Sequence, residues 1–301
     1  MLKTINITKP LMIGVEDLFL NNNDQRRLDH PKVGGVILFK RNFKDKKQIT
    51  ALCDHIHQIN PEIIIGIDQE GGRVQRLDNE EFSQLRNLYD IAKDYANNKE
   101  ETILLVQNHA QIMSSELKTI GIDLCFAPVI DLYHQKSQII FKRSFSDNPE
   151  VVIALSDIYV NEMKKNGIIP VLKHFPGHGS VILDTHKETV IDHRNLNDLE
   201  KTDLKPFIYH AKNLNAIMAS HMLLPKIDKK IVSFSNEWLQ TILREKYGFK
   251  GIIFSDDLGM NAALNEVSNK KDCVIECLNA GCDIAILGND FDVIDHVLMD
   301  L

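Results

Sequence analysis

Residues 63–77 read IIIGIDQEGGRVQRL, and this stretch indicates how the whole chain folds. Its first five residues are apolar, and charged residues follow at once, beginning with Asp68. The run is too short and too uniformly apolar for a surface strand, so it suits a parallel strand that is covered on both faces. We therefore interpret it as a buried strand that delivers polar side chains at its C-terminal end.

Similar apolar runs recur along the chain, at residues 11–15, 34–39, 124–128, 168–173, 216–220, 251–255 and 283–287. Segments with helical periodicity separate them, for example residues 47–59, 101–121 and 235–248, the last with a Ser235 or Asn236 cap. Eight strands that alternate with helices predict an α/β fold, a single-domain (β/α)8 TIM barrel. A doubly wound sheet is the alternative. No linker interrupts the alternation, so we expect one catalytic domain over residues 1–301.

Composition excludes several classes of protein. The net charge of −7 and the pI near 5.9 argue against a general nucleic-acid binder, which would carry a basic patch. No apolar run approaches the roughly 20 residues that span a bilayer, and the first residues, MLKTINITKP, do not resemble an export signal. The five cysteines form no CxxC pair, so we expect a reduced, cytoplasmic protein without disulfides.

Polar residues follow nearly every predicted strand. In a barrel of this kind the active site lies at the C-terminal ends of the strands, so these residues are candidates for one site. In chain order they are Glu16 and Asp17, Lys40–Asn42, residues 68–76, Asp131, residues 173–186, His221, Asp256 and Asp257, and Asn289 and Asp290.

Two of these strand ends allow more than one interpretation. Asp68 suits the recognition of vicinal hydroxyls, but a turn held by an ion pair between Asp68 or Glu70 and Arg73 or Arg76 explains the motif equally well. The strand at residues 251–255 delivers Asp256, a candidate nucleophile on a rigid element, and then Asp257, which suits a helix N-cap. Spacing alone does not select between these two carboxylates.

The stretch KHFPGHGSVILDTH at residues 173–186 is rich in histidine and glycine. His174 and His178 have the spacing of helical zinc ligands, but Pro176 and Gly177 between them prevent a helix. A loop that gathers His174, His178, Asp184 and His186 around zinc stays a minor alternative. We expect no metal ion and no cofactor.

Several motifs together resemble those of family 3 glycoside hydrolases, and most closely the single-domain bacterial β-N-acetylglucosaminidases of cell-wall recycling. In order they are DQEGGRVQR, FAPVIDL, KHFPGHGS…DTH, SH…P…D and GFKGIIFSDDLGM, and the match runs from HPKVGGVILFKRN to AGCDIAIL. The resemblance implies a TIM barrel, a two-step hydrolysis that retains the anomeric configuration, and a muropeptide substrate of the N-acetylglucosaminyl-1,6-anhydromuramyl type.

The resemblance also implies roles for individual residues. Asp256 would be the nucleophile and His186 the general acid/base, with Asp184 as its partner. In an extended loop Asp184 and His186 point the same way, so the carboxylate can set the imidazole tautomer. The remaining matched positions would hold the terminal N-acetylglucosamine; they are Asp68, Arg76, Arg143, Lys173 and His174.

Three alternatives stay open beside this hydrolase. The first is a glycoside phosphorylase on the same fold, because a histidine repels incoming phosphate less than a glutamate does. The second is a catalytically silent sugar-binding barrel, and the third is a metal-dependent hydrolase.

Overall fold

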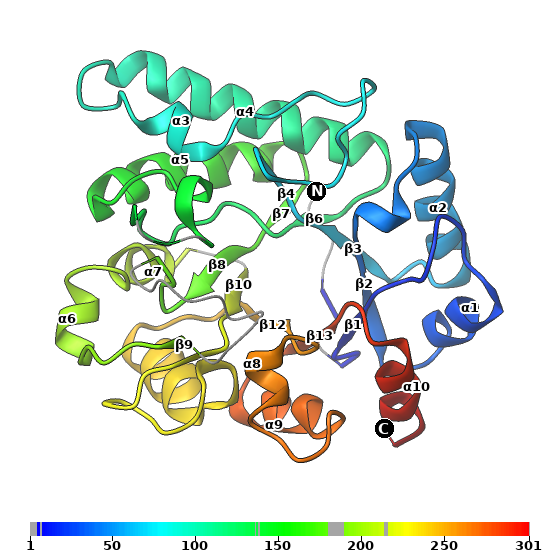
Figure 1. Ribbon diagram of the computed structural model, residues 1–301. Helices are drawn as coiled ribbons and strands as arrows, with labels where there is room; N and C mark the ends of the chain where they lie inside the picture. The colour runs from blue at the N-terminus through cyan, green and yellow to red at the C-terminus, as the bar shows by residue number, and fades with distance from the viewer. Residues whose placement is uncertain are drawn as a thin grey trace.

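The computed structural model describes residues 5–6, 8–135, 137, 139–179, 190–213 and 216–300. Its central feature is one parallel sheet whose strands lie in the order β7-β6-β3-β2-β1-β13-β12-β10-β8. Figure 1 shows helices surrounding these strands. The sheet strands are β1 (Leu11–Ile13), β2 (Val33–Leu38), β3 (Ile64–Ile67), β6 (Leu124–Cys125), β7 (Ile169–Pro170), β8 (Leu172–Phe175), β10 (Ala216–Ala219), β12 (Ile252–Asp257) and β13 (Ile284–Leu287).

The sheet closes on itself through β7 and β8, which stand at its two ends although only Val171 separates them in the chain. β7 pairs with β6, and β8 pairs with β10. Val129 and Lys173 form a further parallel bridge, and the Ile130 N–H donates to the Lys173 carbonyl at 3.0 Å. The predicted (β/α)8 barrel is confirmed. The strand predicted at residues 168–173 is in fact two short strands, because the chain changes its partner at Val171.

Helices alternate with the strands as the periodicity predicts. The α-helices are α1 (Asn22–Leu28), α2 (Lys46–Ile59), α3 (Leu88–Ala92), α4 (Lys99–Thr119), α5 (Pro149–Lys165), α6 (Leu196–Glu200), α7 (Lys205–His210), α8 (Asn261–Leu264), α9 (Asp272–Ala280) and α10 (Phe291–Asp300). Short 3-10 turns lie at η1 (Lys40–Asn42), η2 (Phe141–Arg143) and η3 (Val232–Phe234). Two small sheets pair β4 (Gln69–Gly71) with β5 (Val74–Gln75) and β9 (Val190–Ile191) with β11 (Met222–Leu223).

One predicted helix differs in its winding. The segment η4 (Glu237–Lys246) is a π-helix, and beyond its end the Tyr247 N–H still donates to the Ile242 carbonyl, five residues back. Of the two predicted caps, Ser235 acts, because its hydroxyl accepts the Trp238 N–H at 3.1 Å, whereas Asn236 makes no side-chain cap bond. Within the described ranges, no helix combines the length and the apolar character that crossing a bilayer requires.

The strands are covered on both faces, as their composition predicts. Alternate residues of the strands point inward and form a cluster inside the barrel, with Phe126 and Phe254 in edge-to-face contact at 5.6 Å. The larger cluster lies between the strands and the surrounding helices, and there α2 contributes Ile49, Leu52, Cys53 and Ile56. Apolar side chains thus close the interior of the barrel and leave its C-terminal end to polar residues.

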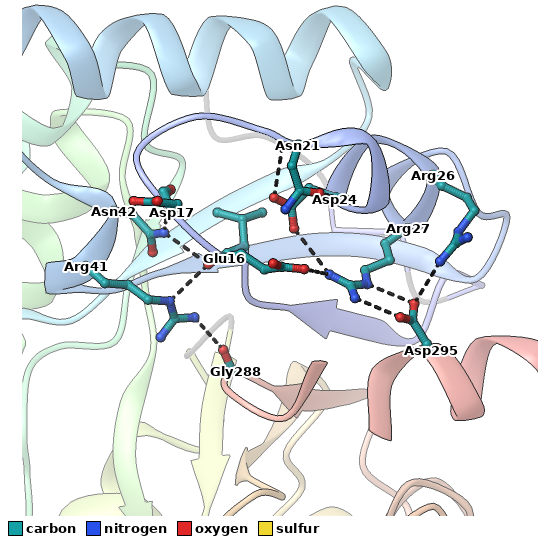
Figure 2. Close-up of polar contacts among 11 residues, drawn as sticks. Glu16, Asp17, Asn21, Asp24, Arg26, Arg27, Arg41, Asn42, Gly288 and Asp295 are labelled. Atoms are coloured by element: carbon teal, nitrogen blue, oxygen red, sulfur yellow. Dashed lines mark hydrogen bonds and ion pairs between the residues drawn. The ribbon is translucent and has the colours of Figure 1, made fainter. Parts of the chain in front are cut away.

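A buried ionic cluster joins the first and the last helix (Figure 2). The Arg27 side chain on α1 is 3% exposed, and its Nε and Nη2 donate to the two carboxylate oxygens of Asp295 on α10 at 2.9 and 2.8 Å. Its Nη1 donates to Glu16, in the loop that follows β1, at 2.6 Å. This bidentate pair attaches the two helices on either side of the β1–β13 junction.

Candidate active site

A cavity of about 1050 Å³ opens at the C-terminal ends of the strands. Its wall includes Ile37, Met218 and Ile286, which belong to the apolar cluster inside the barrel. The polar residues of the wall are Asp68, Arg73, Arg76, Arg143, Lys173, His174, His178, Asp256, Asp257, Asn261, Asn289, Asp290 and Asp292. The volume is at the upper end of the range of small-molecule sites.

The structure brings together six of the eight residues that the sequence singles out. Asp256 and the five predicted sugar-binding residues, Asp68, Arg76, Arg143, Lys173 and His174, all line this one cavity. The other two, Asp184 and His186, lie outside the described residues. The roles assigned to all eight remain predictions.

Lys173, on β8, stands between two carboxylates. Its Nζ lies 2.6 Å from Asp68 Oδ1 and 2.7 Å from Glu70 Oε1. Asp68 also accepts a bond from Arg76 Nη2 at 3.0 Å through its other oxygen. The ion pair to Arg76 that one interpretation predicted for Asp68 is therefore present, and it forms part of the cavity wall.

Arg143 reaches the same cluster from η2. Its Nε and Nη2 donate to the two oxygens of Glu70 at 2.8 and 2.7 Å. This fork-to-fork geometry is the strong form of an arginine–carboxylate pair. Glu70 therefore fixes two cationic side chains, one on β8 and one on η2.

The cluster keeps its charges through mutual attraction. Burial alone would raise the pKa of Asp68, but Lys173 and Arg76 outweigh burial and lower it. In the same way burial is outweighed at Glu70, whose pKa falls to about 2 because of Arg143 and Lys173. Burial would lower the pKa of Lys173, yet Asp68 and Glu70 raise it. Near neutral pH Asp68, Glu70 and Lys173 are therefore all charged.

Glu70 is a residue that the sequence did not single out for the site. It is 1% exposed and lies on β4, two residues after Asp68. Side chains at i and i+2 of an extended segment point to the same side, so its alternation with Asp68 was the available signal. A turn with a local ion pair explained the motif more simply. The motif gave no indication of the long-range partner Arg143.

Replacing Glu70 with glutamine is expected to destabilise the fold by about 3–5 kcal/mol near neutral pH, because Lys173 and Arg143 would lose a buried partner. A carboxylate with a lowered pKa stabilises the fold above its unfolded value of 4.5, and that contribution is lost as the pH falls toward about 2. The difference between wild type and variant should therefore shrink below pH 4.5.

Urea unfolding at a series of pH values measures this difference. The control is Glu62→Gln, because Glu62 makes an exposed pair with Lys9 at 2.7 Å and should matter little. A gap between wild type and Glu70→Gln that stays constant from neutral pH down to pH 3 would contradict the assignment.

His174 is oriented by Asp131, which follows the β6 segment. Asp131 Oδ2 lies 2.7 Å from His174 Nδ1, and Oδ1 accepts the backbone N–H groups of His174 and His178 at 3.1 and 2.7 Å. A carboxylate only accepts, so Nδ1 carries the proton and Nε2 faces Arg143 Nη2 at 3.5 Å. Burial raises the pKa of Asp131, but His174 lowers it overall. Asp131 thus sets which edge of the imidazole faces the cavity.

His178 lies in the same wall with a different environment. It is 3% exposed, and burial lowers its pKa to about 4, so the ring is neutral near neutral pH. Within the described part of the chain, neither ring nitrogen has a hydrogen-bond partner. His174 is held by Asp131, so the two histidines differ in their contacts although the sequence presents them alike.

Across the described ranges no cluster of three or more His, Cys, Asp or Glu is arranged to hold a metal ion.

The two carboxylates at the end of β12 are also held differently. Asp256 Oδ1 accepts the backbone N–H of Asp257 at 2.8 Å. Asp257 accepts three bonds through its own carboxylate, from the Gly259 N–H at 3.0 Å, the Gly288 N–H at 3.2 Å and Asn289 Nδ2 at 2.7 Å. The Asp257 side chain is thus attached to the loop after β13, and both carboxylates line the cavity.

Polar residues at the other strand ends support the site without lining it. Arg41 bonds to the ends of β1 and β13, and Asp131 holds His174. His221, after β10, bonds to the Asp257 carbonyl. The ring of strand-end residues that the sequence shows is thus divided between a cavity wall and the side chains behind it.

Known proteins resemble this chain in sequence and in fold. Residues 7–299 match the glycosyl hydrolase family 3 N-terminal domain. The sequence is 40% identical over 296 residues to a beta-hexosaminidase from Nitrosomonas eutropha, across 97% of this chain and 84% of that protein. It is 41% identical over 290 residues to a beta-hexosaminidase from Stenotrophomonas maltophilia, across 96% of this chain and 85% of that protein.

Among solved structures, the fold matches NagZ from Neisseria gonorrhoeae in complex with N-trifluoroacetyl-D-glucosamine. The TM-score is 0.91 at 36% identity, and the match covers 97% of this chain and 85% of that one. Family, sequence and fold agree over nearly the whole chain. The protein is therefore a glycoside hydrolase and belongs to glycoside hydrolase family 3.

Proposed function

We propose that the protein is a retaining exo-β-N-acetylglucosaminidase that removes a terminal, non-reducing N-acetylglucosamine through a covalent glycosyl-enzyme. One observation carries the proposal: Asp256 lines the same cavity as Asp68, Arg76, Lys173 and the other predicted sugar-binding residues. A single carboxylate near a dense set of charged hydrogen-bonding groups suits attack on a sugar that those groups hold.

The relatives support an N-acetylhexosamine as the sugar. Those at about 40% identity are beta-hexosaminidases, and the matching Neisseria structure holds a derivative of glucosamine. A catalytically silent barrel finds no support in these comparisons.

In the first step Asp256 would attack the anomeric carbon. The bond from that carbon to the leaving oxygen breaks, an ester to Asp256 forms, and the leaving oxygen takes a proton from His186. In the second step a water oxygen attacks the same carbon, its proton passes to His186, and the Asp256 carboxylate is regenerated. Asp184 would hold the imidazole of His186 in the tautomer that both steps need. The two inversions together retain the β-configuration.

The wall charges would hold the sugar during both steps. Lys173 and Arg143 are fixed by Glu70, so little side-chain entropy remains to be lost when a hydroxyl binds. Asp68, already ionised, can accept hydrogen bonds from sugar hydroxyls in addition to those from Lys173 and Arg76. This rigid arrangement favours positioning of the anomeric carbon beside Asp256.

The finer parts of the proposal concern substrate and setting. We propose a muropeptide of the N-acetylglucosaminyl-1,6-anhydromuramyl type, acted on by residues 1–301 as one catalytic domain during cell-wall recycling. The five cysteines are free and buried, which fits a reducing, cytoplasmic setting.

A panel of aryl β-glycosides tests the activity. In the presence of EDTA, the N-acetylglucosaminide should be cleaved far faster than the glucoside or the xyloside, and it should release free N-acetylglucosamine with or without phosphate. A sugar 1-phosphate as the product would favour the phosphorylase alternative. Loss of activity in EDTA would favour a metal-dependent reaction.

A further inference from the structure

The orientation of Asp256 depends on the peptide unit that follows it. The Asp257 N–H donates to Asp256 Oδ1 at 2.8 Å. This bond limits rotation of the Asp256 carboxylate, so anything that turns the 256–257 peptide plane also turns the carboxylate. Two sets of contacts, one on the Asp257 side chain and one on the Asp257 carbonyl in the next peptide unit, fix residue 257 at its Cα and so limit the direction of its N–H.

The first set attaches the Asp257 side chain to the loop after β13. Its Oδ1 accepts the Gly259 and Gly288 N–H groups at 3.0 and 3.2 Å, and its Oδ2 accepts Asn289 Nδ2 at 2.7 Å. A Cβ added to Gly288 would lie 2.9 Å from Asp257 Oδ2 and 2.6 Å from the Phe39 ring. Because glycine has no Cβ, residue 288 can lie this close to the Asp257 carboxylate and the Phe39 ring.

Arg41 determines which way Asn289 points. Its Nη1 donates to Asn289 Oδ1 at 2.6 Å, so the amide nitrogen of Asn289 faces Asp257. Arg41 is itself fixed, because its Nη2 donates to the Gly288 carbonyl at 2.7 Å and its Nε to the Val15 carbonyl at 3.0 Å (Figure 2). Its guanidinium also lies over the Phe39 ring, 4.6 Å from the centroid.

The second set holds the Asp257 carbonyl. It accepts the Met260 N–H at 3.0 Å and lies 3.1 Å from Nε2 of the fully buried His221. A carbonyl can only accept, so Nε2 carries the proton, and in the neutral ring Nδ1 accepts from the Ser233 hydroxyl at 2.7 Å.

We propose that Asp257 is a positioning residue for the nucleophile, held from one side by Arg41 through Asn289 and from the other by His221. Its own carboxylate does not react; it fixes the N–H that orients Asp256. This inference rests on the proposed function, because it assumes that Asp256 is the nucleophile.

An exchange of side chains tests the first set of contacts. In Asp257→Asn, an amide group faces the amide nitrogen of Asn289, so covalent labelling by a fluorosugar, measured per active site, should slow about 100-fold. The double variant Asp257→Asn/Asn289→Asp restores a donor facing an acceptor at unchanged net charge. It should recover most of the labelling rate, whereas binding of the product N-acetylglucosamine should stay near wild type in both.

The second set of contacts has its own variants, which keep the proposal testable if the exchange fails to fold. His221→Phe removes the donor and should slow labelling about 10-fold or more, while His221→Gln keeps a donor and should be milder. The control is His210→Phe, because His210 is also buried and bonds to a serine, Ser156 at 2.7 Å, but lies on α7. It should leave the labelling rate unchanged.

The outcomes separate the two proposals. If wild type labels at Asp256 while Asp257→Asn and His221→Phe label at the wild-type rate, the positioning role is wrong and the proposed function stands. If the exchange variant is no faster than Asp257→Asn, the Asn289 contact is not the means of positioning. If wild type labels at Asp257 itself, the proposed nucleophile is wrong and the inference falls with it.

Discussion

Replacement of Asp256 by alanine is expected to reduce hydrolysis of an aryl N-acetyl-β-glucosaminide by about 10⁴-fold or more. The variant lacks the carboxylate that forms the covalent intermediate, and loss of a nucleophile removes most of the rate enhancement of an enzyme. Binding of N-acetylglucosamine should persist, because the Lys173 and Arg143 cluster is unchanged. Steady-state kinetics and calorimetric titration with the product measure the two properties on the same preparation.

Chemical rescue is the matching positive result. Azide should enter the space left by the Asp256 side chain and give an α-glycosyl azide from a substrate with an activated leaving group. Asp257→Asn is the matched comparison, because it should be slow yet still form the glycosyl-enzyme. An Asp256→Ala enzyme that keeps a tenth of the wild-type rate would place the nucleophile elsewhere.

Replacement of His186 by alanine is expected to reduce cleavage of a natural disaccharide by about 10²–10⁴-fold, the usual contribution of general acid–base catalysis. Aryl glycosides with good leaving groups should lose much less in the first step, because their leaving oxygen needs little protonation. The measurement is kcat/KM against leaving-group pKa. His186 lies outside the described residues, so this prediction rests on its motif.

His193→Ala is the control for this experiment. His193 is exposed and lies close to His186 in the sequence, but it has no place in the proposed mechanism. Its leaving-group dependence should match that of wild type. Equal losses for good and poor leaving groups in His186→Ala would show that His186 is not the proton donor.

The barrel could be predicted because each of its strands is a short apolar run between two amphipathic segments. Burial of both faces leaves a composition signal that does not depend on the partner strand, as β3 and β13 show. The change of partner at Val171 left no such signal, since Pro170 and Val171 suit one strand or two. The π-helical winding of η4 was equally hidden, because the apolar stripe alone does not report which carbonyl each N–H reaches.

The position of a residue in the cavity wall was predicted where a strand end delivers that residue directly. Asp256 and Lys173 follow this rule, and both lie in the cavity wall. Glu70 and Asp131 act through partners 73 and 43 residues away, Arg143 and His174. Such long-range pairs depend on the packing of separate loops, which spacing in the sequence does not encode.

The proposed mechanism depends on covalent attachment of Asp256 to the sugar, and peptide mass spectrometry after inactivation with a fluorosugar detects this attachment. One added glycosyl group is expected on the peptide that contains residues 251–260, at Asp256 within it, and none is expected in Asp256→Ala. Inactivation without an adduct, as expected if the acetamido group of the substrate acted as the nucleophile, would contradict it. An adduct on any other residue would contradict it equally.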